Sequence, residues 1–121
     1  MAEKRILLVE DYPETVEMVK TFLTLKGFAV SVAMDGQAGL QTAQAEKPDL
    51  VLLDLMLPKM TGLEVLKKMK ENEATAKIPV IIITVRTESD EIKEAIALGA
   101  EYYIIKPFDV NDLLKIITRY I

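Results

Sequence analysis

The sequence predicts an α/β protein with a doubly wound five-stranded parallel sheet, folded as a three-layer α/β/α sandwich. Two observations favour this class. Five short apolar segments recur along the 121 residues, and stretches in which apolar residues have helical spacing lie between them. Continuous apolar runs indicate strands buried on both faces, as in parallel sheets that helices cover on both sides. The length predicts one domain, residues 1–121, and 50% hydrophobic residues are enough for one core.

The expected elements alternate five times between strand and helix. The strand runs are residues 6–9, a weaker run at 29–33, and residues 50–53, 80–83 and 102–105. Helical spacing of apolar residues appears at Val16, Val19, Phe22 and Leu23, at Leu63, Leu66 and Met69, at Ile92 and Ile96, and at Leu113, Ile116 and Ile117.

Residues that start and stop helices support these boundaries. Pro13 suits the first turn of the first helix and Gly27 its exit, while Pro48 and Pro79 precede the third and fourth strands. Asp109 is expected to cap the last helix.

The composition excludes several classes of function. The chain has no Cys and no His, so thiolate metal sites, thiol nucleophiles and histidine-based triads are impossible, and any metal must be held by oxygen ligands. A net charge of −4 argues against direct binding of nucleic acid. No run is long enough to span a membrane, which predicts a cytoplasmic protein. The six Met residues are interpreted mainly as core filler.

Polar residues follow four of the five expected strands. They are Glu10 and Asp11 after the first, Asp54 after the third, Thr84 after the fourth and Lys106 after the fifth. Since the carboxyl ends of parallel strands share one edge, we expect these groups to converge there. Any one of them alone would most simply be a turn, cap or solvated residue, but the conjunction indicates a site.

Carboxylates gathered in this way repel one another unless something positive lies among them. Glu10, Asp11 and Asp54 carry three formal negative charges, which one divalent ion and the ammonium of Lys106 would neutralise. Such a neutral site is suited to an incoming phosphoryl group.

The chain resembles the receiver domains of bacterial two-component response regulators, most closely the single-domain chemotaxis-regulator kind. The resemblance rests on residues 8–11, on 48–54 with Pro58 and Gly62, on 83–84, on 98–100 and on 106–108. The strand order 2-1-3-4-5 comes from the resemblance to flavodoxin-like and chemotaxis-regulator sheets, because the residue pattern alone does not state which strands are neighbours.

The resemblance implies a phosphorylation switch that catalyses its own phosphoryl transfer rather than a conventional enzyme. Asp54 would be the phosphoacceptor. Asp11, Asp54 and the backbone carbonyl of Met56 would ligate Mg²⁺, with Mn²⁺ as a substitute, and Glu10 would act through a metal-bound water. Lys106 would pair with the phosphoryl group, and the bond between Lys106 and Pro107 resembles a cis peptide of the family.

The resemblance also implies a readout. Thr84 would bind a phosphoryl oxygen and Tyr103 would turn from exposed to buried, altering a face formed by residues 90–121. Because the chain has no His, the phosphodonor would be a sensor histidine kinase or a phosphotransfer protein, or a small phosphodonor. An unidentified output protein would read the switch, and the chain would be a monomer or weak dimer.

Two departures from the family pattern affect the expected rates. Val85 stands where a small residue is usual and is expected to narrow access to Asp54. Met56 and Arg86 occupy positions that tune dephosphorylation, without a predicted direction.

Two other functions compete with the phosphorylation switch. A flavodoxin-like FMN carrier would need a phosphate-binding loop after the first strand, but residues 10–14 are acidic there. A receiver that serves only as a phosphorylation-independent scaffold is the main alternative, and the intact set of strand-end residues argues against it.

Overall fold

The computed structural model describes residues 3–85 and 90–121. Over these residues strands and helices alternate along the chain. The strands are β1 (Arg5–Val9), β2 (Ala29–Ala33), β3 (Leu50–Asp54), β4 (Val80–Thr84) and β5 (Tyr102–Ile105). The helices are α1 (Pro13–Leu25), α2 (Gly36–Glu46), α3 (Gly62–Glu71), α4 (Asp90–Ala97) and α5 (Val110–Ile117).

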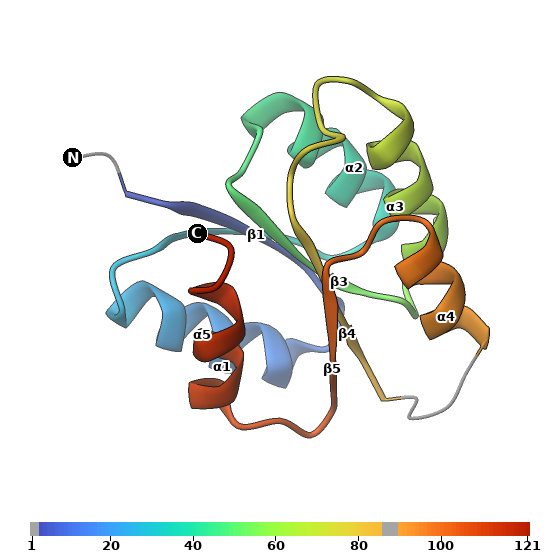
Figure 1. The fold of residues 1–121 in the computed structure, drawn as a ribbon. Coiled ribbons are helices and arrows are strands. Elements are labelled where there is room, and N and C mark those ends of the chain that lie inside the picture. Colours follow the sequence, from blue (N-terminus) through green and yellow to red (C-terminus); the bar gives the residue numbers. More distant parts are fainter. Residues whose placement is uncertain (1–2, 86–89) are drawn as a thin grey trace.

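The strands form one parallel sheet in the order β2-β1-β3-β4-β5. Helices α1 and α5 cover one face, and α2, α3 and α4 cover the other (Figure 1). The predicted α/β sandwich and the strand order 2-1-3-4-5 are therefore confirmed.

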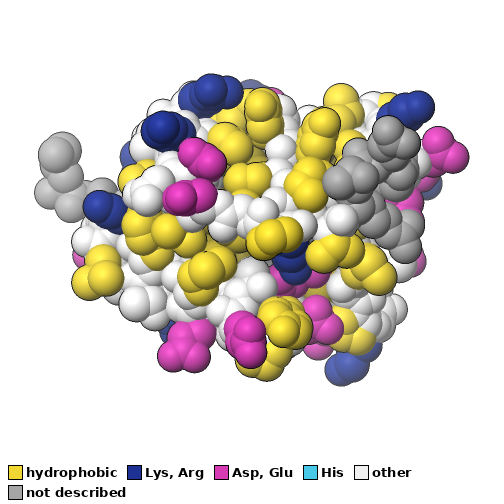
Figure 2. All heavy atoms as spheres, turned by 90° about the horizontal axis from the view of Figure 1, so that it is seen from below, with side chains coloured by type: hydrophobic (Ala, Val, Ile, Leu, Met, Phe, Trp, Pro, Cys, Tyr) yellow, Lys and Arg dark blue, Asp and Glu magenta, His cyan; other side chains and the backbone are white. Residues whose placement is uncertain are grey.

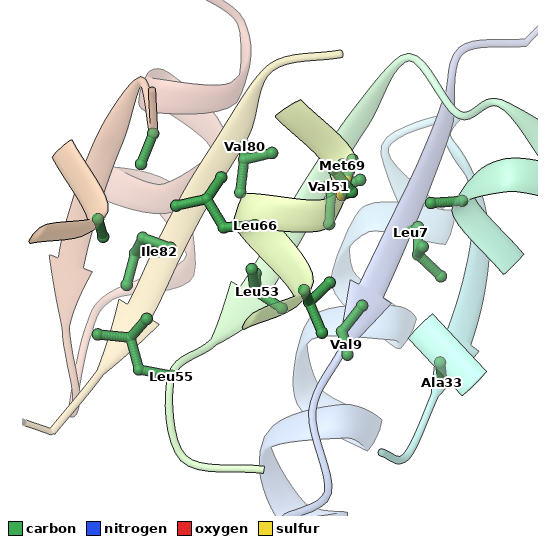
Figure 3. Packing of buried hydrophobic residues seen from close by; sticks show 14 of the residues in the cluster. Leu7, Val9, Ala33, Val51, Leu53, Leu55, Leu66, Met69, Val80 and Ile82 are labelled. Carbon is green, nitrogen blue, oxygen red and sulfur yellow. The ribbon is translucent and has the colours of Figure 1, made fainter. Parts of the chain in front are cut away.

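The core is divided by the sheet into two apolar clusters. In β3, Val51 and Leu53 pack toward α2, α3 and α4 (Figure 3). Leu50 and Leu52 pack toward α1 and α5. All four side chains are fully buried. Burying such a side chain contributes about 1.5–3 kcal/mol, so a central strand gains on both faces, which explains its continuous apolar run.

The edge strand β5 departs from the prediction that its run is buried on both faces. Tyr102 and Tyr103 are each 40% exposed. Because β5 lies at the end of the sheet, it has a strand neighbour on one side only. Ile96 of α4, predicted to lie on a core face, is also exposed, which leaves apolar surface on this side of the molecule.

The interpretation of the methionines as core filler is wrong for most of those described. Met69 is buried in the core, but Met18, Met34 and Met56 are between 43% and 50% exposed. Two of these, Met18 and Met56, line the cavity described below.

The helix boundaries that were predicted at Pro13, Gly27 and Asp109 are confirmed. Helix α1 begins at Pro13, and Gly27 follows it with a φ of 97°, a value that favours glycine. Asp109 caps α5, because its Oδ1 accepts a hydrogen bond from the backbone N–H of Asn111 at 2.7 Å. None of the described helices is long and apolar enough to cross a membrane.

Candidate functional site

The carboxyl ends of four strands bring the predicted residues to one edge of the sheet. The strand register keeps these ends level. Glu10 and Asp11 follow β1, Asp54 ends β3, Thr84 ends β4 and Lys106 follows β5. Figure 2 looks onto the molecule from this side and shows acidic and basic side chains next to each other in a hollow among hydrophobic ones.

The ammonium of Lys106 joins two of the carboxylates. Its Nζ donates to Oδ2 of Asp54 at 3.1 Å and also to Oε1 of Glu10. The backbone N–H of Lys106 donates to the carbonyl of Thr84 at 2.7 Å, so the start of the segment after β5 is held against the end of β4. The three side chains form a charged cluster with little access to water, since their exposed fractions are 15% for Lys106, 8% for Asp54 and 0% for Glu10.

Of the three side chains in this cluster, Glu10 lies in the least favourable environment for a negative charge. Its Oε2 has no hydrogen-bond partner among the described residues. Burial, and next the adjacent Asp54, raise the pKa of Glu10 to about 8, against the lowering effect of Lys106. A buried oxygen without a donor is a position that a cation or a metal-bound water would satisfy.

Lys106 stays charged at this edge. Burial lowers the pKa of Lys106, but the hydrogen bond to Glu10 and the negative charge of Asp54 outweigh that effect and raise it. The ammonium is therefore a permanent positive charge beside Asp54 at neutral pH.

Glu10, Asp11 and Asp54 could hold a metal ion. One carboxylate oxygen from each lies within 4.8 Å of the others. Glu10 and Asp54 are buried, while Asp11 is exposed and faces the approach from solvent. All the donors are oxygens, the ligands preferred by Mg²⁺ and other hard cations. The unpartnered oxygen of Glu10 and the excess of negative charge both fit such an ion.

Asp54 is held from two sides but remains accessible. Its Oδ1 accepts a hydrogen bond from the backbone N–H of Met56 at 3.0 Å, and its Oδ2 accepts the bond from Lys106. Although only 6% of the residue is exposed, its side chain borders a cavity of about 510 Å³. The cavity is lined by Asp11, Tyr12, Thr15, Met18, Asp54, Met56, Val85, Lys106, Pro107 and Phe108.

Sequence reasoning did not assign Tyr12, Thr15, Met18 and Phe108 to the site. Thr15 and Met18 lie three residues apart in α1, so the helical repeat places both on one side of the helix, and Asp11 lies two residues before the helix begins. That spacing was a usable signal. The cavity therefore has an apolar side, formed by Tyr12, Met18 and Phe108, next to the charged side chains that line it.

The remaining predicted residues lie around this centre. Thr84 is fully buried at the end of β4, and Val85 after it is 58% exposed on the cavity wall. Tyr103 lies in β5 and is exposed, away from the cavity lining. The bond between Lys106 and Pro107 is cis, as expected. Arg86 lies outside the described residues.

This arrangement matches a known family. The family model of the response regulator receiver domain matches residues 6–118. The chain belongs to this family. The receiver-domain resemblance drawn from the sequence is thus confirmed, and the domain is a signalling module of two-component systems rather than a conventional enzyme.

Relatives of this receiver domain include both whole regulators and isolated receivers. It is 41% identical over 110 residues to the transcriptional regulatory protein DltR of Streptococcus agalactiae, covering 91% of this chain and 48% of that protein. The chain therefore spans about half the length of the curated relatives that it matches.

Two solved structures resemble the receiver domain along nearly its whole length. Chemotaxis protein CheY4 of Vibrio cholerae has a TM-score of 0.92 and 31% identity, covering 99% of this chain and 100% of that one. The receiver domain of sensor histidine kinase PA1611 of Pseudomonas aeruginosa, whose structure has a magnesium ion coordinated in the active site cleft, has a TM-score of 0.91 and 27% identity, covering 98% of both chains.

Proposed function

We propose that this receiver domain is a phosphorylation switch in which Asp54 accepts the phosphoryl group. The observation that carries the proposal is the position of Asp54: a buried carboxylate at a strand end, between Lys106 and two further carboxylates, that still borders an open cavity. We call Glu10, Asp11, Asp54 and Lys106 the acceptor site.

The proposed reaction is an in-line displacement at phosphorus. A carboxylate oxygen of Asp54 forms the new O–P bond as the P–N bond of a phosphohistidine breaks, and the electron pair of that bond passes to the imidazole nitrogen, which is protonated. With a small acyl phosphate, the leaving group is the carboxylate instead. The single negative charge of Asp54 is replaced by about two on the phosphoryl group, beside the ammonium of Lys106.

Asp11 and Asp54, with the backbone carbonyl of Met56, would hold Mg²⁺ directly, and Glu10 would act through a water. When bound, the ion would neutralise charge on the transferring oxygens. Mn²⁺, which also prefers oxygen ligands, would serve in its place. The magnesium ion in the PA1611 receiver domain supports this assignment.

The proposed signal is a rearrangement around Thr84 and Tyr103. The hydroxyl of Thr84, at the end of β4, would bind a phosphoryl oxygen and draw the following residues inward. Tyr103 would then turn from exposed to buried, altering the face formed by α4, β5 and α5. Its present exposure of 40% is compatible with the resting state.

The proposed phosphodonor is a histidine kinase or phosphotransfer protein, because the chain contains no His. The output partner stays unidentified. The transcriptional regulators among its relatives are about twice as long, and the acidic balance of this chain suggests that any DNA binding would be done by another part or partner. A cytoplasmic location and a monomeric or weakly dimeric state stay predictions.

The decisive experiment measures protein mass after incubation with Mg²⁺ and acetyl phosphate. We expect the wild type to gain one phosphoryl group and Asp54→Asn to gain none. Asp49→Asn is the matched control, since Asp49 lies at the opposite end of β3, where it accepts a hydrogen bond from the backbone N–H of Arg5, and it should be phosphorylated normally. A wild type that gains no mass would leave the scaffold alternative, and equal gain in Asp54→Asn would place the acceptor elsewhere.

A further inference from the structure

The loop that follows Asp54, residues 55–61, is a closed unit tied to the acceptor carboxylate. Within it the N–H of Met60 donates to the carbonyl of Pro58 at 2.7 Å. The N–H of Gly62, the residue directly after the loop, donates to the carbonyl of Leu55 at 3.1 Å and so ties the two ends of the loop together. The N–H of Met56 donates to Asp54. Displacement of one end of this loop would therefore be passed on to the other.

Two glycines at helix starts hold this loop from opposite sides. A Cβ at Gly36, the first residue of α2, would lie 1.9 Å from the carbonyl oxygen of Met60. A Cβ at Gly62, the first residue of α3, would lie 2.3 Å from the carbonyl oxygen of Asp54. In both places backbone lies against backbone at a distance that no other residue allows.

A charged contact adds to the contact with α2. Asp35 caps α2 by accepting a hydrogen bond from the N–H of Ala38 at 2.8 Å, and its Oδ2 lies 3.8 Å from Nζ of Lys59 in the loop. Lys59 is largely exposed, so this pair contributes less than the backbone contact at Gly36.

We propose that Gly36 is a positioning residue for the acceptor site, acting through this loop on the Met56 backbone. The inference rests on the proposed function, in which the carbonyl of Met56 is a metal ligand. Gly36 itself touches neither metal nor phosphoryl group. It sets how far the loop can sit toward α2, and thereby where the Met56 carbonyl and N–H stand relative to Asp54.

The displacement that a Cβ at residue 36 would force on the loop is large compared with the variation in ligand distance that a Mg²⁺ site tolerates. An alanine Cβ at residue 36 must move from 1.9 Å to at least 3.0 Å from the Met60 oxygen, a shift of about 1 Å. Mg²⁺ requires ligands at about 2.0–2.1 Å in near-octahedral geometry, with a tolerance of about 0.2 Å. Disturbing residues that orient metal ligands typically costs about 10–100-fold in affinity.

The test compares Gly36→Ala with Gly39→Ala, one turn later in the same helix. A Cβ at Gly39 would meet the Cγ1 of Val9 at 2.7 Å, so this control disturbs packing of α2 on the sheet without touching the loop. Mg²⁺ is titrated into each folded protein while the amide resonances of Met56 and Asp54 are followed by NMR. We expect the Kd to rise about 10-fold or more in Gly36→Ala. The rise in Gly39→Ala should be much smaller, because its Cβ meets side-chain methyl groups of Val9 rather than backbone.

A second variant keeps the proposal testable if Gly36→Ala does not fold. Lys59→Gln removes the exposed contact with Asp35 while keeping the length of the side chain. Mg²⁺ is titrated in about 1 M salt, which screens the charge of an exposed side chain, so that loss of the cation has little effect of its own. Loosening of the loop is then expected to raise the Kd about twofold.

The outcomes separate this inference from the proposed function. Wild-type protein that does not bind Mg²⁺ at Met56 and Asp54 would contradict the metal site itself. If the wild type binds, an unchanged Kd in folded Gly36→Ala would overturn the positioning role, as would an equal loss in Gly36→Ala and Gly39→Ala. If Gly36→Ala does not fold, an unchanged or lower Kd in Lys59→Gln overturns it.

Discussion

The acceptor site and the exposed edge of β5 are built from opposite kinds of contact. At the acceptor site, Lys106 is held by ion pairs to side chains that are almost wholly buried. At the edge of β5, Tyr102 and Tyr103 are exposed and stack with ring centroids 6.1 Å apart. The guanidinium of Arg119 lies 5.8 Å from the ring centroid of Tyr102.

The difference in contact strength separates a fixed region from an adjustable one. Aromatic and exposed cation–π contacts contribute about 0.5–1.5 kcal/mol each, whereas removing one partner from a buried ion pair costs about 3–5 kcal/mol. In the proposed switch, a change of charge at the acceptor site would shift the population of side-chain positions at β5 without disturbing the framework of the acceptor site. Chemistry that needs fixed geometry and a readout that needs movement would then lie in different parts of one small domain.

The largest effect is expected from Lys106→Met, which breaks the fixed region. Without the ammonium, Glu10 and Asp54 lose their buried counter-charge, and we expect the metal-free protein to lose about 3 kcal/mol of unfolding free energy at about pH 8. Urea denaturation measures this loss. Millimolar Mg²⁺ should recover part of it, because the ion supplies positive charge to the same carboxylates.

Lys67→Met is the matched control for that substitution. Lys67 is exposed on α3, so its replacement should change stability by less than about 0.5 kcal/mol. Equal stability of the two variants would mean that the ion pairs of Lys106 do not hold the acceptor site together.

The pH dependence of stability tests the burial of Glu10. Its pKa is about 8 in the folded protein against 4.5 for an ordinary Glu, so between these values the folded state holds a proton that the unfolded state has lost. Raising the pH through this window therefore favours unfolding, by up to about 1.4 kcal/mol per pH unit. Thermal or urea denaturation of metal-free protein across this window should show the decline.

Glu10→Gln should remove most of that decline, since the amide does not titrate. Mg²⁺ should also flatten the profile by favouring the ionised carboxylate. If Glu10→Gln kept the wild-type slope, another group would be responsible for the pH dependence.

Much of the fold could be predicted from local sequence patterns. The features that could not be predicted depend on how the strands are arranged in the whole sheet. The fully buried β3 and β4 were predictable because continuous apolar runs are required where helices cover both faces. The exposure of Tyr102 and Tyr103 did not follow from the apolar pattern, because an edge strand of this composition has the same local pattern as a central one. Only the family resemblance implied that Tyr103 is exposed. The strand order came from the family resemblance, since no residue pattern states which strands are neighbours.

The acceptor site was predictable for a similar reason. Glu10, Asp54 and Lys106 could be brought together because parallel strands end at a common edge. The contact of Lys106 with Glu10 could not be predicted, because the two residues are 96 positions apart in the sequence and their contact depends on how their side chains extend toward each other in the fold. Met18 was misassigned to the core because apolar residues on a cavity wall carry no chemical signature.

A smaller effect is expected at the boundary between the two regions, from Val85→Ala. Val85 is exposed on the cavity wall near Asp54, and shortening it should widen the approach for a phosphodonor. We expect phosphorylation by acetyl phosphate to be about threefold faster, which corresponds to about 0.7 kcal/mol in the barrier. The rate of mass gain measures this. Leu25→Ala, which lies outside the cavity lining and is 80% exposed, is the control and should leave the rate unchanged.

The smallest effect is expected from Arg119→Gln, which loosens only the β5 edge. Losing the cation over Tyr102 should lower the unfolding free energy by about 0.5 kcal/mol and shift the ring resonances of Tyr102 and Tyr103. The Kd for Mg²⁺ should stay at the wild-type value, because neither of the two ion pairs that Lys106 makes with Glu10 and Asp54 includes this residue. Arg119→Lys keeps a positive charge but not the planar guanidinium, so its unfolding free energy should lie between those of the wild type and Arg119→Gln. A Kd that moved with Arg119 would show that the edge of β5 and the acceptor site are not separate regions even at rest.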